Sequence, residues 1–394
     1  MTASEAVIVA GAGPVGLTAA LLLADAGVPV TVVEKRAQLS AASKASTFHP
    51  PTLAILHHLG VLDAVQGLGQ VVDRLQYRTA ADGVFAEFPL SDLRGETPFP
   101  YRLHLEQAQL TPIMLERLAA HPHARVLFAT ELVDVVAGPR AVEVRVRREG
   151  REETLAASYL IGADGSRSDV RRSLGIAFDG EDYPDKVLRV MTTDDLGTLL
   201  PGIAPVTYLF NHGRSASFLR MPDCWRIILR VPREVDDATA LDPDWIFARL
   251  ADVMPHCRRL PTVVMKDVYG VARRVAASYR AGRVVLIGDS AHITNTRGGM
   301  NMNCGLHDAF AVAPAIARAL RNGNAADVDA AADERRRVAT QLLIPRTDRN
   351  VSGGEAWLQQ VESMAADPVK RVAHLRASAM LDMTAVPAPV HGHA

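Results

Sequence analysis

Three glycines near the start of the chain, Gly11, Gly13 and Gly16, have the spacing of a turn that holds phosphate groups. In such a turn the first glycine permits the tight bend, the second lets the backbone approach a pyrophosphate, and the third lets the next helix pack on the preceding strand. The helix N-terminus then offers free N–H groups and a positive dipole end. Glu34, at the end of the next Val-rich run, can accept hydrogen bonds from a ribose diol. These residues predict a dinucleotide site and leave open which dinucleotide it holds.

Two later carboxylates stand at the ends of apolar runs. Asp164 lies within 162–165 (Gly-Ala-Asp-Gly), and Asp289 follows the run 284–288 and precedes a Gly-rich stretch at 297–303. The Asp289 carboxylate can hydrogen-bond a ribitol or ribose hydroxyl, and the glycines after it let backbone N–H groups face a ligand. Each carboxylate also has a structural interpretation, because Asp caps helices and Asp-Gly pairs are common in β-turns.

The elements that would position these residues alternate between strand and helix. Residues 6–10 and 28–33 have the β-branched composition of buried strands, and an apolar helix pattern fills 15–26 and stops at Gly27. This order implies parallel pairing with a right-handed crossover. Further helices are expected at 50–66, 107–119, 243–253 and 305–322, with mostly helical structure over 325–365.

The middle of the chain has the pattern of antiparallel strands. Residues 142–147 alternate Val with charged residues, which predicts a strand with one wet face inside a hairpin-like insert at 124–161. Other strand-like runs, separated by Gly and Pro, occur at 187–191, 206–210, 215–221, 225–231 and near 262–271. The predicted fold class is α/β, with a Rossmann-type domain and a second domain built on an antiparallel β-sheet.

The composition disfavours several classes of function. The 394 residues are 48% hydrophobic and 22% charged with a net charge of −1, which fits a two-domain globular protein and favours neither nucleic acid nor a membrane surface as partner. The three cysteines are scattered, so we expect buried thiols in a reducing cytosol and no metal site. The N-terminus lacks a basic segment, and no run approaches the roughly 20 apolar residues of a membrane span, so we expect a cytoplasmic protein.

The three ligand-binding stretches, in this order, resemble the para-hydroxybenzoate hydroxylase family, the class A FAD-dependent monooxygenases, over about residues 5–345. The segment 44–62, Gln107 and the run 334–337 resemble further parts of that family. The resemblance implies FAD as cofactor and NADPH or NADH as cosubstrate. The FAD contacts that it implies are Gly11, Ala12, Gly13, Pro14, Val15, Gly16, Glu34, Lys35, Lys44, Gln107, Leu132, Asp164, Gly288, Asp289, Gly298, Gly299, Met300 and Asn301.

The resemblance also implies a domain division. A discontinuous, glutathione-reductase-like FAD domain would comprise 1–75, 101–180 and 272–345. A substrate-binding β-sheet domain would comprise 76–100 and 181–271. Residues 346–394 would form C-terminal helices and a loose tail.

The chemistry implied by the family is hydroxylation. NAD(P)H reduces the flavin, O₂ adds at flavin C4a, and the hydroperoxide delivers one oxygen to an electron-rich ring. The substrate would be an aromatic, phenolic or polyketide-like small molecule of secondary or catabolic metabolism. An FAD-dependent oxidase, reductase or epoxidase acting on a polyketide- or terpenoid-like substrate is the alternative within the same fold. A plain NAD-dependent dehydrogenase would leave Asp164 and Asp289 without a role, and a homodimer is compatible with the sequence.

The chain departs from the family at two places. It has Asn295-Thr296 where the family usually has two prolines, and Asn301 where the family has Gly. Asn tolerates a left-handed backbone better than other non-Gly residues, so we expect FAD binding to persist. The missing prolines alter the pocket wall beside the flavin and leave the substrate type open.

Candidates for orienting and activating the substrate lie on the expected β-sheet domain. Tyr208 and Arg220 are the catalytic candidates, and Tyr208 shares a strand face with Val206 and Phe210. His212 belongs to the same set of candidates.

Three other polar residues receive structural interpretations. Arg226 and Arg230 share a strand face, for which we favour a solvated charged surface. His292 is expected to pack or hydrogen-bond under the flavin loop rather than to shuttle protons.

Overall fold

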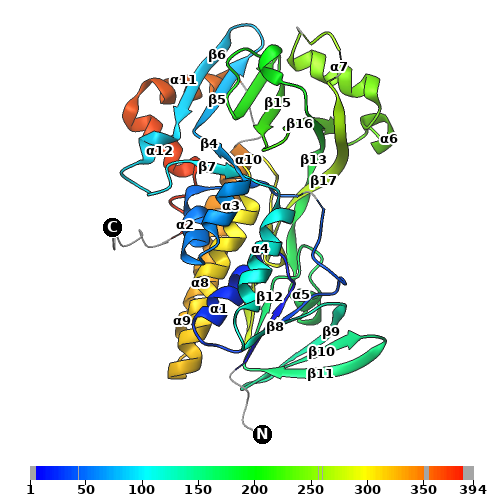
Figure 1. The fold of residues 1–394 in the computed structure, drawn as a ribbon, viewed down its shortest axis with the longest axis vertical. Helices are drawn as coiled ribbons and strands as arrows, with labels where there is room; N and C mark the ends of the chain where they lie inside the picture. Colours follow the sequence, from blue (N-terminus) through cyan, green and yellow to red (C-terminus); the bar gives the residue numbers. More distant parts are fainter. Residues whose placement is uncertain (1–5, 43, 256, 260, 350–354, 385–394) are drawn as a thin grey trace.

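The computed structural model describes residues 6–42, 44–255, 257–259, 261–349 and 355–384. Figure 1 shows two lobes: one holds a parallel sheet with its helices, and the other holds a larger antiparallel sheet. The long strands β13 (Phe178–Thr192) and β17 (Val263–Ala276) run from one lobe into the other.

A six-stranded sheet forms the centre of the first lobe. In spatial order its strands are β18 (Arg280–Ala281), β19 (Val284–Leu286), β12 (Tyr159–Gly162), β1 (Val7–Ala10), β2 (Val30–Val33) and β8 (Ala124–Leu127). β1 pairs in parallel with both β2 and β12, and β12 pairs in parallel with β19. The residues that follow these strands, Gly11, Glu34, Asp164 and Asp289, therefore lie at one edge of the sheet, where ligands of doubly wound folds bind. The predicted parallel pairing is confirmed.

Helices of the first lobe pack on this sheet and on each other. α1 (Pro14–Asp25) packs against both α8 (Asn301–Asn322) and α4 (Gln107–Ala119). The single helix expected at 50–66 is wrong, because Gly60 has a φ of +68° and separates two helices. These are α2 (Pro50–His58) and α3 (Leu62–Leu68). α8 begins at Asn301, earlier than the predicted residue 305.

Two small sheets complete the first lobe. One consists of β9 (Thr130–Ala137), β10 (Val142–Arg148) and β11 (Arg151–Ala157). The predicted one-sided strand is confirmed, since the valines of β10 are buried in the same core as β1 while its charged residues are exposed. The other sheet consists of β3 (Thr47–Phe48), β7 (Arg102–His104) and β4 (Gln70–Val72).

An eight-stranded sheet forms the second lobe. In spatial order its strands are β20 (His292–Ile293), β17, β13, β16 (Trp225–Pro232), β15 (Arg214–Arg220), β14 (Val206–Asn211), β5 (Arg74–Thr79) and β6 (Gly83–Pro89). Ile227 and Leu229 of β16 share a core with Ile246 and Leu250 of α7 (Pro243–Val253), which follows the short α6 (Asp237–Ala240). One face of the sheet is thus covered by α7, and the alternate residues of β16 point to the other face.

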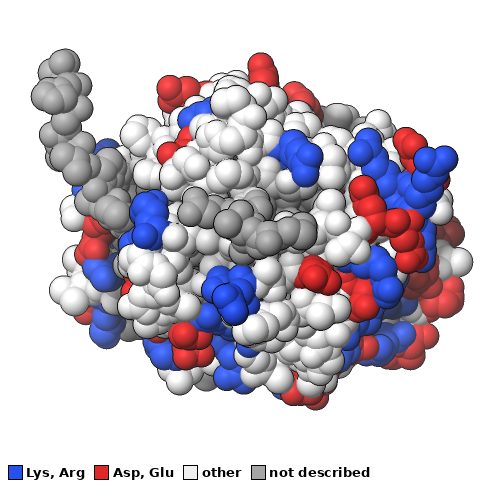
Figure 2. Space-filling model, turned by 90° about the horizontal axis from the view of Figure 1, so that it is seen from below, with Lys and Arg blue, Asp and Glu red and all other residues white. Residues whose placement is uncertain are grey.

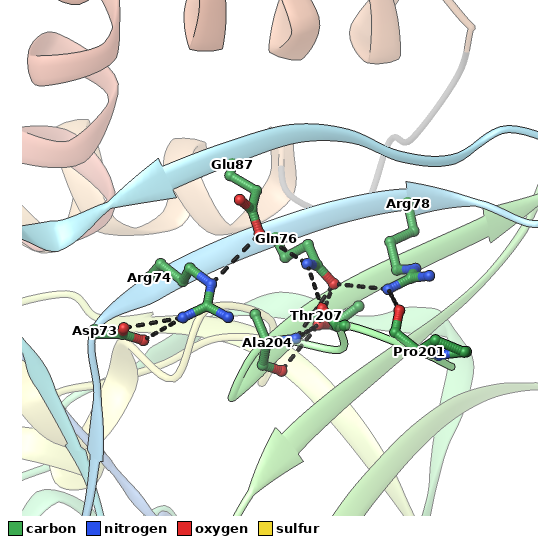
Figure 3. Close-up of polar contacts among 9 residues, drawn as sticks. Asp73, Arg74, Gln76, Arg78, Glu87, Pro201, Ala204 and Thr207 are labelled. Carbon is green, nitrogen blue, oxygen red and sulfur yellow. Dashed lines mark hydrogen bonds and ion pairs between the residues drawn. The ribbon is translucent and has the colours of Figure 1, made fainter. Parts of the chain in front are cut away.

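A partly buried polar network holds the hairpin of β5 and β6 onto this sheet (Figure 3). Nε2 of Gln76 donates to Oε1 of Glu87 at 2.8 Å and to the carbonyl oxygen of Gly202 at 2.9 Å, and Oγ1 of Thr207 donates to Oε1 of Gln76 at 3.2 Å. Arg78 donates to the carbonyl oxygen of Pro201 at 3.1 Å. Because β5 pairs in parallel with β14, this network fixes the register of two strands that lie far apart in the sequence.

The C-terminal region is helical over its described residues, as predicted. It contains α9 (Ala326–Val338), a π-helical turn (Ala339–Leu343), α10 (Ile344–Arg349), α11 (Glu355–Ala366) and α12 (Pro368–Ser378). Val361 of α11 and Leu375 of α12 share a core with Tyr77 and Phe88 of the β5–β6 hairpin. The tail expected to be loose, residues 385–394, lies outside the described residues.

The surface and the cysteines agree with the composition. Figure 2 shows acidic and basic side chains beside one another on the face seen from below. All three cysteines are buried free thiols, as predicted. Among the described residues, no helix is both long enough and apolar enough to cross a bilayer.

Candidate active site

A cavity of about 900 Å³ lies between the two lobes. One wall is made by the turn after β1, the ends of β2 and β12, and residues 289–302. The other wall is the inward face of the eight-stranded sheet. This volume is near the upper end of the range of about 300–1,000 Å³ for small-molecule sites, so the cavity is large enough for a sizeable ligand.

The three glycines of the first turn have different physical roles. Gly11 has a φ of +102°, and a Cβ on it would lie 2.4 Å from the carbonyl oxygen of Ala163. A Cβ on Gly16 would lie 2.0 Å from the carbonyl oxygen of Gly11. Gly13 has no atom within 4 Å of its Cβ position and lines the cavity. Gly11 and Gly16 therefore hold the turn and its helix, whereas Gly13 keeps space open.

Glu34 and the start of α1 form one polar end of the cavity. Oε2 of Glu34 accepts from the backbone N–H of Ala12 at 2.9 Å, and Oε1 accepts from the backbone N–H of Arg36 at 3.0 Å. Gly13 is the N-cap of α1, and no side chain caps that helix. The positive end of the helix dipole is thus left for a ligand, beside a fixed carboxylate.

Asp164 orders the next loop and also lines the cavity. Its carboxylate accepts from Oγ of Ser168 at 2.6 Å and from the backbone N–H groups of Asp169 at 2.7 Å and Val170 at 3.1 Å. These bonds start α5 (Asp169–Ser173). Burial raises the pKa of Asp164, and the hydrogen bonds oppose that shift. The capping interpretation of this residue is therefore physically satisfied.

Asp289 and Asn301 meet at the start of α8. Nδ2 of Asn301 donates to Oδ1 of Asp289 at 2.8 Å, and Oδ1 of Asn301 lies 3.2 Å from Nδ1 of His292. Asn301 is the first residue of a helix and does not have a positive φ. The expectation that Asn301 replaces Gly in a left-handed backbone is therefore wrong, because its helical backbone needs no such tolerance. Its side chain instead positions the Asp289 carboxylate.

A buried ionic network lies behind this turn. Asp308 accepts from Nε2 of His292 at 2.8 Å, from Nε of Arg335 at 2.6 Å and from the backbone N–H of Gly288 at 3.0 Å. Burial opposes charge on His292, but its interactions with Cys304 and Asp308 outweigh burial and raise the pKa of His292. Burial likewise opposes charge on Asp308, but His292 and Arg335 lower its pKa. The hydrogen-bonding role predicted for His292 is confirmed.

The same network offers a donor set that resembles a metal site. The ligand atoms of His292, Cys304 and Asp308 lie within 4.8 Å of one another. Arg335, however, donates to Asp308 and lies with Nη2 3.1 Å from Sγ of Cys304, so a guanidinium already supplies the positive charge. We therefore assign an ion-pair network that supports the turn at Gly288.

The inward face of the eight-stranded sheet brings arginines into the cavity. Arg226 and Arg230 line it. The solvated face favoured for these two residues is wrong: Arg226 is only 5% exposed, pairs with Glu106, and donates through Nη1 to Oγ of Ser46 at 2.7 Å. The first lobe covers this face, and strand alternation alone does not encode that long-range contact.

Two further residues that line the cavity were not among the sequence candidates. Arg102, on β7, lines the cavity, and burial lowers its pKa, while the electrostatic interaction with Tyr208 and the hydrogen bond that Arg102 donates to the Tyr208 hydroxyl oppose the shift. Arg297 enters from the loop before Gly298, and its Nη2 donates to Oγ of Ser215 at 2.8 Å. The signal for Arg297 was its place in the Gly-rich stretch, whereas Arg102 carried no motif.

The two catalytic candidates have different locations. Tyr208 lines the cavity. Arg220 does not; its guanidinium carbon lies 5.6 Å from the centre of the Trp225 ring, and its carbonyl oxygen is 2.8 Å from Nδ1 of His104. His212 lies in the exposed turn between β14 and β15. Of these three, only Tyr208 can contact a ligand in the cavity.

The cavity gathers nearly all of the predicted cofactor contacts. Those lining it are Gly11, Ala12, Gly13, Pro14, Val15, Glu34, Lys35, Lys44, Gln107, Leu132, Asp164, Asp289, Gly298, Gly299, Met300 and Asn301. Gly16 and Gly288 lie behind the lining. A Cβ on Gly288 would lie 3.0 Å from Cγ1 of Val15, so this glycine serves the close packing of the turn on α1.

These features fit a flavin dinucleotide. The open space at Gly13, the uncapped start of α1 and the Glu34 carboxylate suit the pyrophosphate and ribose, and Asp289 with residues 298–301 lies further along the same cavity. A Rossmann-type sheet joined through one cavity to an antiparallel sheet defines a two-lobed FAD-dependent oxidoreductase.

Comparisons with known proteins identify the family. Residues 4–344 match the family model described as FAD binding domain. The chain is 32% identical over 383 residues to 6-hydroxy-3-succinoylpyridine 3-monooxygenase from Pseudomonas putida strain DSM 28022 / S16, covering 93% of this chain and 95% of the relative. It is 28% identical over 389 residues to para-nitrophenol 4-monooxygenase from Pseudomonas sp. strain WBC-3, and the match covers 94% of this chain and 90% of that relative. The crystal structure of p-nitrophenol 4-monooxygenase from Pseudomonas putida DLL-E4 superimposes with a TM-score of 0.88 at 25% identity, covering 97% of this chain and 99% of that one.

The chain belongs to the FAD binding domain family and, within it, to the class A flavin-dependent monooxygenases. The family resemblance and the fold class predicted from the sequence are confirmed. The protein is an FAD-dependent monooxygenase that uses a reduced nicotinamide cosubstrate and O₂. The alternative chemistry, an oxidase, reductase or epoxidase, is not favoured by these relatives.

Proposed function

We propose that this monooxygenase hydroxylates a small aromatic ring that already carries a hydroxyl group. The observation that carries the proposal is the single cavity that extends from Glu34 and Gly13 to Tyr208 and Arg230, because it connects a dinucleotide-binding end to a space lined by aromatic and cationic side chains. The substrates named by the two Pseudomonas relatives, a hydroxypyridine and a nitrophenol, support this class of ring.

In this proposal the chain's own residues divide the work along the cavity. The turn at Gly13 and the start of α1 hold the pyrophosphate of FAD, Glu34 holds its ribose, and Asp289 with residues 298–301 holds the part that leads to the ring system. Bound FAD supplies the reduction and oxygen chemistry, which no side chain provides. The protein orients the substrate and keeps bulk water away from it.

The groups around Tyr208 favour the ionised form of a phenol. Arg102 and Tyr208 hydrogen-bond to each other, and Arg297 lies close enough to Tyr208 to interact electrostatically. Positive groups and a phenolic hydroxyl near a substrate oxygen stabilise phenolate, and an ionised hydroxyl makes the ring more electron-rich. Tyr208 is the proposed contact to the substrate hydroxyl, with Arg102 as the residue that positions it.

The test is oxygen incorporation by the purified holoenzyme. We expect NADPH or NADH to bleach the visible flavin absorbance without oxygen, and a phenol such as 4-nitrophenol or 3-hydroxybenzoate to gain one atom from isotopically labelled O₂, as read by mass spectrometry. Oxidation of the phenols without oxygen insertion would contradict the proposal and favour the oxidase or reductase alternative.

A further inference from the structure

Arg230 is a cation that faces the cavity without an anionic partner. It is half-buried near the end of β16, and its side chain makes no hydrogen bond or ion pair within the described part of the chain. The carboxylate whose charge acts most strongly on it, Asp185, does not line the cavity. Partial removal of a guanidinium from water costs free energy unless an anion pairs with it. A ligand that carries a negative charge would therefore stabilise Arg230.

Arg297 shares this part of the cavity with Arg230. Burial and the positive charge of Arg230 lower the pKa of Arg297 to about 10. The two guanidinium groups are therefore close enough to repel each other across a poorly solvated space. An anion bound between them would convert this repulsion into two attractions.

The neighbouring arginines of the wall differ from Arg230 in having acidic partners. Arg189 pairs with Asp267 through two hydrogen bonds, at 2.8 and 2.7 Å, and Arg226 pairs with Glu106. Their charges are balanced within the protein and serve its architecture. The charge of Arg230 is left for whatever enters the cavity.

We infer that the substrate carries a carboxylate, which Arg230 and Arg297 bind while its ring lies toward Tyr208. The planar fork of a guanidinium matches the two oxygens of a carboxylate, so such a pair fixes orientation as well as charge. This inference rests on the proposed function and narrows its substrate class from hydroxylated aromatic rings to hydroxylated aromatic acids.

Another anion could meet the same arginines, namely the phosphate of a nicotinamide cosubstrate. The inference assigns them to the substrate, because Arg230 lies on the wall that carries Tyr208 and Arg297 is close enough to Tyr208 to interact with it electrostatically. The experiment separates the two sources by measuring substrate binding and flavin reduction independently.

The first measurement compares acids with neutral analogues on the wild-type holoenzyme. 3-Hydroxybenzoate, 4-hydroxybenzoate and 3-(3-hydroxyphenyl)propanoate, each beside its primary amide, are titrated into the oxidised enzyme, and the flavin spectrum reports binding. At least one acid should bind about 10- to 100-fold more tightly than its amide, the range expected for hydrogen bonds to a charged group. If no acid binds more tightly than its amide, the inference is overturned.

The second measurement uses variants of the proposed anion site. Arg230→Met should raise the Kd of the best acid about 10-fold or more and leave that of its amide within a factor of about two, and Arg230→Lys should keep part of the difference. Arg233→Met is the matched control, because Arg233 lies just beyond β16, is exposed and pairs with Asp182. If the Arg230→Met variant does not retain FAD, the comparison of acids with amides on the wild-type enzyme still tests the inference.

Flavin reduction identifies the source of the anion. Anaerobic reduction by NADPH and by NADH is measured for wild type and Arg230→Met. If the variant loses affinity for NADPH and keeps its preference for acids, the anion is the coenzyme phosphate and the inference is wrong. Acids that bind but are never oxygenated would refute the proposed hydroxylation and leave the acid site standing, so the two failures are distinguishable.

Discussion

Asn301, the first residue of α8, fixes the Asp289 carboxylate. Its Nδ2 donates a hydrogen bond to Oδ1 of Asp289 at 2.8 Å. Asp289 lines the cavity beside residues 298–301. A carboxylate held by a neighbouring amide keeps one orientation, which would suit it to accept a hydrogen bond from a hydroxyl group of FAD in the proposed site. The residue that departs from the family pattern thus supports a carboxylate of the proposed FAD site.

This contact predicts that Asn301→Ala weakens FAD binding. Loss of a hydrogen bond to a charged group costs about 1.5–3 kcal/mol when its whole effect reaches the ligand, so the Kd for FAD should rise about 10- to 150-fold. Flavin fluorescence quenching during titration of apoprotein gives the Kd. Asn322→Ala, the same change at the exposed far end of α8, should leave it unchanged.

Asn301→Gly distinguishes a side-chain role from a backbone role. If position 301 needed a left-handed backbone, Gly would restore the family pattern and bind FAD at least as well as Asn. Because the position is helical, Gly should bind FAD no better than Ala and should also lower the unfolding free energy by up to about 1 kcal/mol. An Asn301→Gly enzyme that matches wild type in both measurements would refute the side-chain role.

In the glycine turn, Gly→Ala substitutions at two positions should have different effects, one on folding and one on FAD binding. Gly11→Ala puts a Cβ 2.4 Å from a backbone oxygen at a φ of +102°, so the apoprotein should lose several degrees of Tm or fail to fold. In Gly13→Ala the new Cβ has no atom within 4 Å, so the apoprotein should keep its Tm. The new methyl group would, however, face the space assigned to the pyrophosphate. Thermal unfolding of apoprotein and flavin content after purification separate the two effects. Equal Tm losses in both variants would contradict this division of roles.

A third prediction concerns the negative charge of Glu34 and its contribution to FAD binding. Both of its oxygens accept backbone N–H groups, from Ala12 and Arg36, so the side chain is already oriented. In Glu34→Gln an amide NH₂ must face one of those donors, and an acceptor for ribose is lost. The Kd for FAD should rise about 10- to 100-fold. Glu143→Gln, an exposed residue of β10, is the control and should bind FAD as wild type does.

The sequence predicted the motifs better than it predicted the wall opposite them. Gly11, Glu34 and Asp289 follow strands whose apolar runs are local signals, and parallel pairing brings the ends of such strands together. Arg226 and Arg230 alternate as a strand should, but whether that face meets water or another lobe depends on contacts more than a hundred positions away along the chain, such as that between Arg226 and Ser46.

Asn301 illustrates a second limit of the sequence. A change from Gly to Asn has a standard backbone explanation, and that explanation was wrong here because α8 begins earlier than its apolar pattern does. In the first turn of α8, the side chain of Asn301 bonds Asp289 and that of Asn303 bonds the backbone of Thr47 and His49, so these polar residues do not extend the hydrophobic periodicity from which the helix was predicted.

The ionic network of Asp308, His292 and Arg335 predicts how stability depends on pH. The pKa of His292 is raised above its ordinary 6.5, so its contribution is complete below pH 6.5 and is lost as pH rises through the folded-state pKa. The pKa of Asp308 is lowered below 3.8, so its contribution is present above pH 3.8 and is lost as pH falls through the folded-state pKa. The network is therefore complete near pH 4–6.5 and weakens on the alkaline side.

Urea unfolding of FAD-saturated enzyme between pH 6 and 9 tests this prediction. As pH rises, the unfolding free energy of wild type should fall more steeply than that of His292→Gln, because the variant has no imidazole proton to release. The difference between the two slopes should be at most about 1.4 kcal/mol per pH unit. His57→Gln, at an exposed site on α2, should follow wild type. Asp308→Asn leaves two buried cations without their partner and should cost about 3–5 kcal/mol at pH 6. Parallel pH profiles for wild type and His292→Gln would show that His292 is neutral in the folded protein and that the network is held by Arg335 and Asp308 alone.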